Sequence, residues 1–270
     1  MDRDYRKERQ YVVSRADEFL RYLHREVLTE KAIQLLKVVA RQTDVYIFSG
    51  IIRNFLLGFT ENRDVDVVVA EVDNLSLPHS LLRGCKIEEN SFGGYKLLID
   101  NISIDAWPIA STWGLLHEGL KPKPYSLIRT AFFNFSSIAF SYNDKRFIFD
   151  GNLCSFLRSN IMDVVYPFNP NPALCILNTA YYARKYKFPI SFKLSKWLIR
   201  YYNEKLPFVE TQERHFHKQI VSNETLAWMM KIVEDALNVY KMKKGQGLSL
   251  DFVQRQYDII DESSATEEEF

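Results

Sequence analysis

The stretch of sequence that decides the fold reads IFSGIIRNFLLG at residues 47–58 and, after a short polar loop, RDVDVVV at residues 63–69. The apolar, β-branched and aromatic run at 45–48 is too short for a helix and predicts a buried strand. Residues 51–57 have apolar side chains at helical spacing, and Gly58 is a typical residue after a helix C-terminus. A second strand is predicted at 64–69. The stretch therefore predicts the order strand, turn, helix, strand.

The second strand carries a pair of carboxylates. Side chains alternate along a strand, so Asp64 and Asp66 share one face while Val65 and Val67 point to the other. Two carboxylates side by side repel each other unless a cation lies between them. Oxygen ligands of this kind suit Mg²⁺, which binds through one or two carboxylates and substrate phosphates. The pattern therefore indicates a magnesium site.

A third carboxylate fits the same scheme. Residues 95–99 and 102–107 read as two strands joined by a turn at Asp100-Asn101. On the second of these strands, Asp105 shares a face with Ser103. If this strand lies beside residues 64–69, Asp105 completes a cluster able to hold two metal ions for an in-line displacement at phosphorus. Asp100 is the competitor for this role, but its place in a turn favours a structural one.

The turn before the predicted helix has the opposite electrostatic character. Free backbone N–H groups and the positive end of a helix dipole at Ser49-Gly50 suit a phosphate, and Gly50 lets the backbone approach it closely. Arg53, one helical turn further on, has two interpretations. It either contacts a triphosphate or pairs with Asp64 or a loop carbonyl as a structural residue.

The remaining sequence predicts an α+β module followed by an all-helical segment. Residues 5–42 have apolar side chains three and four apart and read as helix. A strand pair is expected at 132–140 and 146–149. From residue 170 onward the pattern is helical, with helices predicted around 174–184, 194–202 and 225–242.

Length and composition bound the class of protein. The 270 residues, 47% hydrophobic, are enough for two compact domains without a disulfide or metal to hold them together. The sequence has neither an apolar run of 18 residues nor a charged-then-apolar leader, so we expect no membrane span and no secretory signal. Cys85, Cys154 and Cys175 show no metal-ligand spacing, and a reducing cytoplasm is the expected location.

The net charge of +1 hides an asymmetry. Residues 171–250 contain 13 Lys/Arg against 6 Asp/Glu, a local charge of +7, whereas residues 251–270 contain one Arg against seven acids, a local charge of −6. The basic segment interleaves aromatic and basic side chains as single-stranded RNA sites do. These are Tyr181, Tyr182, Arg184, Lys185, Tyr186, Lys187, Lys193, Lys196, Trp197 and Arg200. A solvated helix face over an aromatic core is the alternative.

The motif at residues 47–69 resembles the nucleotidyltransferase head of bacterial-type CCA-adding enzymes and poly(A) polymerases. Those proteins carry G-G-x-V-R-D-x-L-L-G followed by D-x-D, where this chain has S-G-I-I-R-N-F-L-L-G and D-V-D. Residues 147–151 (FIFDG) resemble the strand before the closing loop of that head, and residues 169–188 resemble the start of its helical neck. The resemblance implies a polymerase-β-like head with a mixed sheet over residues 1–168. It further implies a helical neck-like domain over 169–258, and we expect a flexible acidic tail at 259–270.

The chain also departs from the family pattern. Ser49 replaces the first glycine and Asn54 replaces the aspartate after the arginine. Residues 131–137 (AFFNFSS) lack the charged pair of the R-D-F-T-x-N-A segment, and residues 171–174 lack the Asp and Arg of the E-D-x-x-R neck motif that reads the base. We expect no counterpart of the body and tail domains that grip tRNA. These departures leave the metal chemistry intact and open the choice of nucleotide.

The resemblance implies a Mg²⁺-dependent transfer of a nucleoside monophosphate from an NTP to an acceptor hydroxyl, with release of pyrophosphate. Asp64, Asp66 and Asp105 would hold two metals, and Ser49, Gly50 and Arg53 would contact the NTP. The preferred acceptor is an RNA 3′ end, above all that of tRNA. A head without a body resembles the stand-alone nucleotidyltransferases of toxin–antitoxin and phage-defence systems. The alternatives are nucleotidylation of a protein or small molecule, and a head domain without turnover that acts as a binding module.

Overall fold

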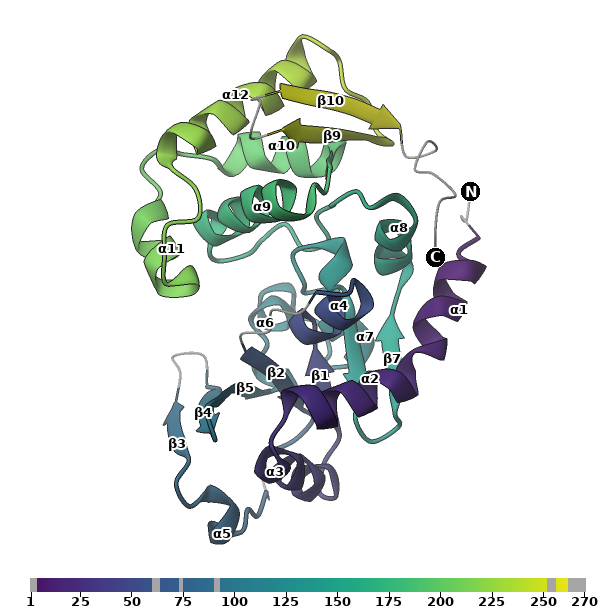
Figure 1. The fold of residues 1–270 in the computed structure, drawn as a ribbon, viewed down its shortest axis with the longest axis vertical. Helices are drawn as coiled ribbons and strands as arrows, with labels where there is room; N and C mark the ends of the chain where they lie inside the picture. The colour runs from purple at the N-terminus through teal and green to yellow at the C-terminus, as the bar shows by residue number, and fades with distance from the viewer. Residues whose placement is uncertain (1–3, 60–63, 73–74, 90–92, 252–255, 262–270) are drawn as a thin grey trace. The chain divides into compact units, whose positions relative to one another are not determined.

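The computed structural model describes residues 4–59, 64–72, 75–89 and 93–251, together with the backbone of 256–261 (Figure 1). Contacts within the chain group it into two compact units. Unit 1 comprises Met1–Ala131 and Phe135–Cys154, and unit 2 comprises Phe132–Asn134 and Ser155–Phe270. Each unit is described by itself.

Unit 1 is built on a seven-stranded mixed sheet with strand order β3-β4-β5-β2-β1-β6-β7. The strands are β1 (Val45–Phe48), β2 (Asp64–Val69), β3 (Lys86–Glu89), β4 (Tyr95–Ile99), β5 (Ile102–Pro108), β6 (Ile138–Ser141) and β7 (Arg146–Phe149). The pair of β2 with β5 is parallel, and the other neighbours in this sheet are antiparallel. Strands β1, β2, β4 and β5 thus lie at the residues where the sequence predicts strands.

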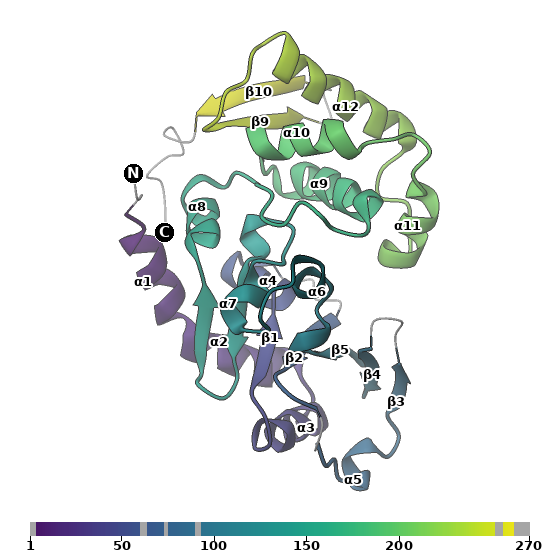
Figure 2. The same ribbon diagram turned by 180° about the vertical axis from the view of Figure 1, so that it is seen from behind.

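Helices cover both faces of this sheet. On one face, α1 (Arg6–Ser14) and α2 (Ala16–Tyr22) lead through a π-helical turn at Leu23–Val27 to α3 (Glu30–Ala40), and α4 (Gly50–Leu56) follows β1. On the other face lie α6 (Trp113–Glu118) and α7 (Pro124–Ile128), which come to the front in Figure 2. The short helix α5 (His79–Leu82) precedes β3.

Each face has its own apolar core. The Phe19 ring of α2 lies 4.9 Å from Phe140 and 5.4 Å from Phe147, measured between ring centroids. On the opposite face, buried residues of the sheet pack with Leu115 of α6 and Leu127 of α7. The sheet is thereby fixed from both sides along most of its central strands.

Unit 2 is mainly helical. Helix α8 (Gly151–Ser159) crosses the division between the units, and α9 (Pro172–Tyr186), α10 (Phe192–Tyr201), α11 (Phe208–Phe216) and α12 (Asn223–Asn238) follow. Among α9 to α12, all but α11 begin at a side-chain cap. The side chains of Asn171, Ser191 and Ser222 accept hydrogen bonds from backbone N–H groups of the first turns of α9, α10 and α12. Such caps satisfy N–H groups that the helix itself leaves without partners.

The fold class is confirmed, but the C-terminal part is not all helical. Strands β8 (Ile190–Ser191), β9 (Gln246–Asp251) and β10 (Gln256–Asp261) form a sheet in the order β10-β9-β8. A side chain at Gly247 would come within 2.8 Å of Ile161 Cδ1, so this strand needs glycine where it packs. The predicted acidic tail begins inside β10, and residues 262–270 lie outside the described residues.

Two further predictions differ from the structure. The predicted single helix at 5–42 is divided into α1, α2, the π-helical turn and α3. The predicted strand at 132–140 is reduced to β6, because residues 132–134 belong to unit 2. There Asn134 donates to Ile161 O at 2.9 Å and accepts from Asp163 N at 3.0 Å. The two units divide within α8. The predicted boundary after residue 168, between a nucleotidyltransferase head and a neck-like domain, stays a prediction.

Among the residues that the structure describes, no helix combines the length and apolar character needed to cross a membrane.

Candidate active site

The parallel pairing of β2 with β5 brings two predicted carboxylates to one place. In the register of this pair, Asp66 lies opposite Asp105 and Asp64 lies opposite Ser103. Residues paired in register point to the same face, and so do residues two apart in a strand. The three acidic residues therefore share one face of the sheet.

The electrostatics of Asp105 show the cost of this arrangement. Burial raises the pKa of the Asp105 carboxyl, and the negative charge of Asp64 raises it further. Lys96, which lies opposite Asp105 in the pair of β4 with β5, lowers this pKa. Because burial is the largest cause, the charged form of Asp105 is disfavoured where it stands. A bound cation would reverse that preference.

Lys96 was missed by the sequence analysis, although a signal for it was present. The two-residue turn at Asp100-Asn101 pairs Ile99 with Ile102, and counting outward from it places Lys96 opposite Asp105. Both turn residues have positive φ, 47° and 70°, as the tight turn between two antiparallel strands requires. Asp100 lies in this turn, away from the register row of Asp66 and Asp105.

Three carboxylates are well suited to Mg²⁺ by the chemistry of their oxygens. Among the described residues, however, no three His, Cys, Asp or Glu side chains approach closely enough to form a ready-made metal site. Asp64, Asp66 and Asp105 are thus gathered on one face, and their role as metal ligands stays a prediction.

The turn between β1 and α4 adjoins these carboxylates. A Cβ added to Gly50 would lie 4.0 Å from Asp66 Oδ2, so the backbone at Gly50 is close to the Asp66 carboxylate. Ser49 has φ 53° and ψ −96°, a conformation that costs a residue with a side chain about 1–3 kcal/mol. The turn is held on both sides, since Ser49 N donates to Ile138 O and Arg53 N donates to Ser49 O, each at 3.0 Å. Ser49 therefore holds a positive-φ conformation that glycine adopts more readily.

The Arg53 side chain lies against its own helix. Its Nε and Nη2 atoms donate to Asn54 Oδ1 at 2.9 and 2.8 Å, and its guanidinium lies 5.8 Å from the centre of the Phe135 ring. Asn54 is buried, with 6% of its surface exposed. These contacts are neither the pairing with Asp64 nor the one with a loop carbonyl that the structural interpretation named, and the contact of Arg53 with an NTP stays a prediction.

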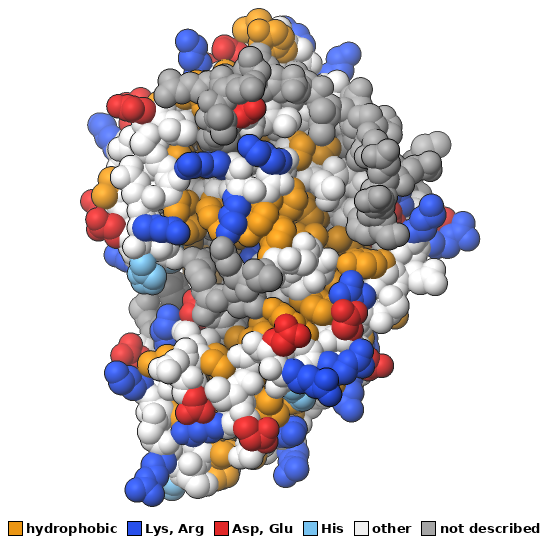
Figure 3. Space-filling view, in the orientation of Figure 1, with side chains coloured by type: hydrophobic (Ala, Val, Ile, Leu, Met, Phe, Trp, Pro, Cys, Tyr) orange, Lys and Arg blue, Asp and Glu red, His pale blue; other side chains and the backbone are white. Residues whose placement is uncertain are grey.

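In unit 2, the predicted RNA-binding residues divide into core and surface. Tyr182 and Trp197 are buried, and the Trp197 indole donates to Pro167 O at 2.7 Å, so neither ring is open to a base. Lys185 is exposed, and its Nζ lies 5.4 Å and 5.3 Å from the ring centres of Tyr181 and Tyr186. Figure 3 shows Lys and Arg side chains spread over the region that α9 to α12 occupy in Figure 1. Tyr182 and Trp197 thus belong to an aromatic core, as the alternative to an RNA-binding surface predicts for them.

Residues 171–174, which stand where the family has its base-reading neck motif, form the start of α9. Asn171 Oδ1 accepts from Leu174 N at 3.0 Å and Pro172 occupies the first turn, which is a standard start for a helix. Asn171 thus caps α9.

The mixed sheet, the strand–turn–helix at 45–56 and the acidic strand that follows define the fold of a nucleotidyltransferase head. Solved structures agree with this assignment. The chain is similar to a CCA-adding enzyme in complex with CTP (TM-score 0.56, 14% identity, 84% of this chain and 56% of that chain). It is similar to the Thermotoga maritima CCA-adding enzyme complexed with tRNA (TM-score 0.55, 14% identity, 84% and 55%).

The chain spans about half the length of these structures. No protein-family model and no curated protein matches its sequence. At this level of identity the similarity concerns the fold, and the resemblance found in the sequence is confirmed at that level.

Proposed function

We propose that this protein is a Mg²⁺-dependent nucleotidyltransferase that transfers a nucleoside monophosphate from an NTP to the 3′ hydroxyl of an RNA, above all tRNA. The observation that carries the proposal is the register of β2 and β5, which puts Asp66 opposite Asp105 beside the Gly50 turn. Acidic oxygens and the backbone N–H groups of a helix start are the two halves of a site for a metal-bound triphosphate.

In this proposal Asp64, Asp66 and Asp105 hold the metal ions. Bound Mg²⁺ would activate the attacking hydroxyl and stabilise the negative charge of the departing pyrophosphate. Asp105, on the metal that holds the incoming hydroxyl, would also accept the proton of that hydroxyl. The backbone at Gly50 approaches the triphosphate, because no side chain stands between it and Asp66.

The choice of RNA as acceptor is supported by two observations. Residues 171–250 carry a local charge of +7, and a basic surface attracts nucleic acid. One similar structure is a complex with tRNA. A head without turnover is the second candidate, which the missing charged pair in residues 131–137 favours.

The test is incubation of purified protein with Mg²⁺, total RNA and each of four α-³²P-labelled NTPs. We expect label in RNA with the wild type and none with Asp66→Asn or Asp105→Asn. Asp100→Asn is the matched control, since it makes the same chemical change in a hairpin turn where asparagine is well tolerated. This control should label RNA as the wild type does.

Other outcomes separate the alternatives. Label in an added protein extract or small-molecule fraction, lost in the same two variants, would keep the chemistry and change the acceptor. Binding of Mg²⁺-NTP without any labelled product would favour the binding module. Equal loss of labelling in Asp100→Asn and Asp105→Asn would refute the assignment of the site.

A further inference from the structure

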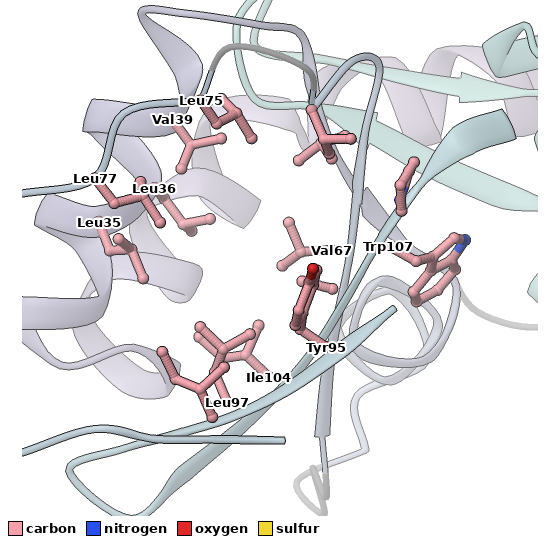
Figure 4. A pocket seen from close by; sticks show the side chains of 15 residues that line it. Leu35, Leu36, Val39, Val67, Leu75, Leu77, Tyr95, Leu97, Ile104 and Trp107 are labelled. Atoms are coloured by element: carbon pink, nitrogen blue, oxygen red, sulfur yellow. The ribbon is translucent and has the colours of Figure 1, made fainter. Parts of the chain in front are cut away.

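A cavity of about 350 Å³ lies in unit 1 on the face of the sheet opposite the carboxylates (Figure 4). Its floor is formed by β2, β4 and β5, through Val67, Leu97 and Ile104. Leu36 of α3 and Leu77 of the segment before α5 lie side by side in its wall. Figure 4 shows these side chains converging on a common space.

The chemistry of the lining restricts what can bind there. Among the described residues that line this cavity, none is charged. Two of them carry polar side-chain atoms, Tyr95 and Trp107, and the Trp107 indole N–H is already donated to Thr112 Oγ1 at 3.0 Å. Phosphates, carboxylates and nucleotides would lose their hydration here without a compensating partner. Water is also poorly held, because an ordered water needs two to four polar partners.

The volume of the cavity suits a small molecule. Its volume falls in the range of about 300–1,000 Å³ that is typical of small-molecule sites. Ile87 of β3 and Tyr95 of β4, 45% and 44% exposed, line the cavity and leave it an open mouth.

We propose that this cavity binds a compact, uncharged organic molecule with a hydrocarbon body and one hydrogen-bonding group. The hydrocarbon body fills the space between α3 and the floor, and the Tyr95 hydroxyl pairs with the polar group. The site is separate from the proposed nucleotidyl-transfer site and does not depend on that activity. It lies directly behind that site, since Val67 follows Asp66 and Ile104 precedes Asp105.

Two probe molecules test the proposal on the full chain, 4-propylphenol and its analogue without the hydroxyl, propylbenzene. We expect both to bind saturably at one site by calorimetry and to displace the neutral apolar dye Nile red. At 100 times the dissociation constant, a ligand specific for the folded state should raise the melting temperature by about 5 °C or more.

Ala106→Phe, which fills the cavity, should abolish binding of both probes. Leu116→Phe is the matched control, because it adds an aromatic ring on α6, where the side chain is 65% exposed. Circular dichroism and the melting temperature establish that each variant is folded.

Tyr95→Phe provides a second test that leaves the cavity shape intact. Losing one hydrogen bond should weaken 4-propylphenol binding about 2- to 12-fold and leave propylbenzene binding unchanged. The proposal is overturned if neither probe binds saturably, or if both bind equally to Ala106→Phe and the wild type. It is also overturned in favour of a second copy of the chain if the protein is a dimer that Ala106→Phe converts to monomer.

Discussion

The two faces of strands β2 and β5 have opposite chemistry on the same backbone. One face presents Asp66 opposite Asp105, each only partly buried. The other presents Val65 and Ile104, opposite each other and 2% and 3% exposed. Strands of a parallel pair are commonly buried on both faces and then read as continuous apolar runs. The acids interrupt this run on one face only. The same two strands thus bury apolar side chains on one side and, on the other, carry a carboxyl whose pKa is raised by burial.

The largest expected effects come from substituting neighbours in β5 that point to opposite faces, because one substitution should affect activity and the other stability. Asp105→Asn should reduce nucleotidyl transfer by about 10³-fold, because it removes a proposed metal ligand. The free energy of unfolding should stay unchanged or rise, because the charged carboxylate is disfavoured by burial. Ile104→Ala should do the reverse, lowering the free energy of unfolding by about 2–4 kcal/mol.

Both variants are measured by urea unfolding and by labelling of RNA per folded molecule. The two faces would not be separable in function if Ile104→Ala, under conditions where it is folded, lost as much activity as Asp105→Asn.

Gly50→Ala tests whether the carboxylate face extends to the turn before α4. The added methyl would lie 4.0 Å from Asp66 Oδ2, an ordinary contact that the fold tolerates. We expect the free energy of unfolding to be unchanged or raised by up to about 1 kcal/mol. By blocking the approach of the triphosphate, the methyl should lower kcat/KM for NTP about 10- to 100-fold. An unchanged kcat/KM would place the triphosphate elsewhere.

Ser49→Gly measures the strain stored at the same turn. Glycine adopts φ 53° and ψ −96° more readily than serine, so the substitution should raise the free energy of unfolding by about 1 kcal/mol. Ser49→Ala keeps the side-chain strain and serves as the control, for which we expect no gain. A lower stability for Ser49→Gly would mean that the serine hydroxyl contributes more than the strained backbone costs.

The smallest expected effect is the contribution of His24 to the pH dependence of the free energy of unfolding. His24 Nε2 lies 2.9 Å from the Tyr142 hydroxyl, and burial together with the charge of Lys37 lowers the pKa of His24 below 6.5. Glu30 opposes this shift. Because the unfolded chain takes up the proton first, this contribution to stability is present above pH 6.5 and is lost as the pH falls below it.

The measurement is urea unfolding at several pH values between 5 and 7.5 for the wild type and His24→Gln. The wild type should lose more stability than the variant on going to the lower pH. Identical pH dependence in the two proteins would show that His24 does not contribute.

The alternation of side chains was a reliable guide where a strand is half buried. It placed Asp64 and Asp66 on one face of β2. The continuous apolar run at 45–48 and the turn at Asp100-Asn101 located β1, β4 and β5 within one residue of their ends. The same reasoning failed for β8 to β10. β8 has two residues, β9 contains a glycine needed for close packing, and their pairing joins segments far apart in the sequence. Residues 132–134 were read as a strand because their apolar character was visible, whereas their hydrogen bonds to residues 161–165 were not.

The local pieces of the candidate site could be read from the amino-acid sequence: two acids two residues apart, a third on a later strand, and a small-residue turn before a helix. These follow from periodicity and backbone preference, which act over a few residues. Only the tertiary structure decided that β5 lies parallel to β2 with Asp105 opposite Asp66, and that Ser49 holds a conformation suited to glycine. It also decided that an apolar cavity lies behind the acids. The reason is physical, since strand pairing and cavities depend on contacts between distant segments, which no local pattern specifies.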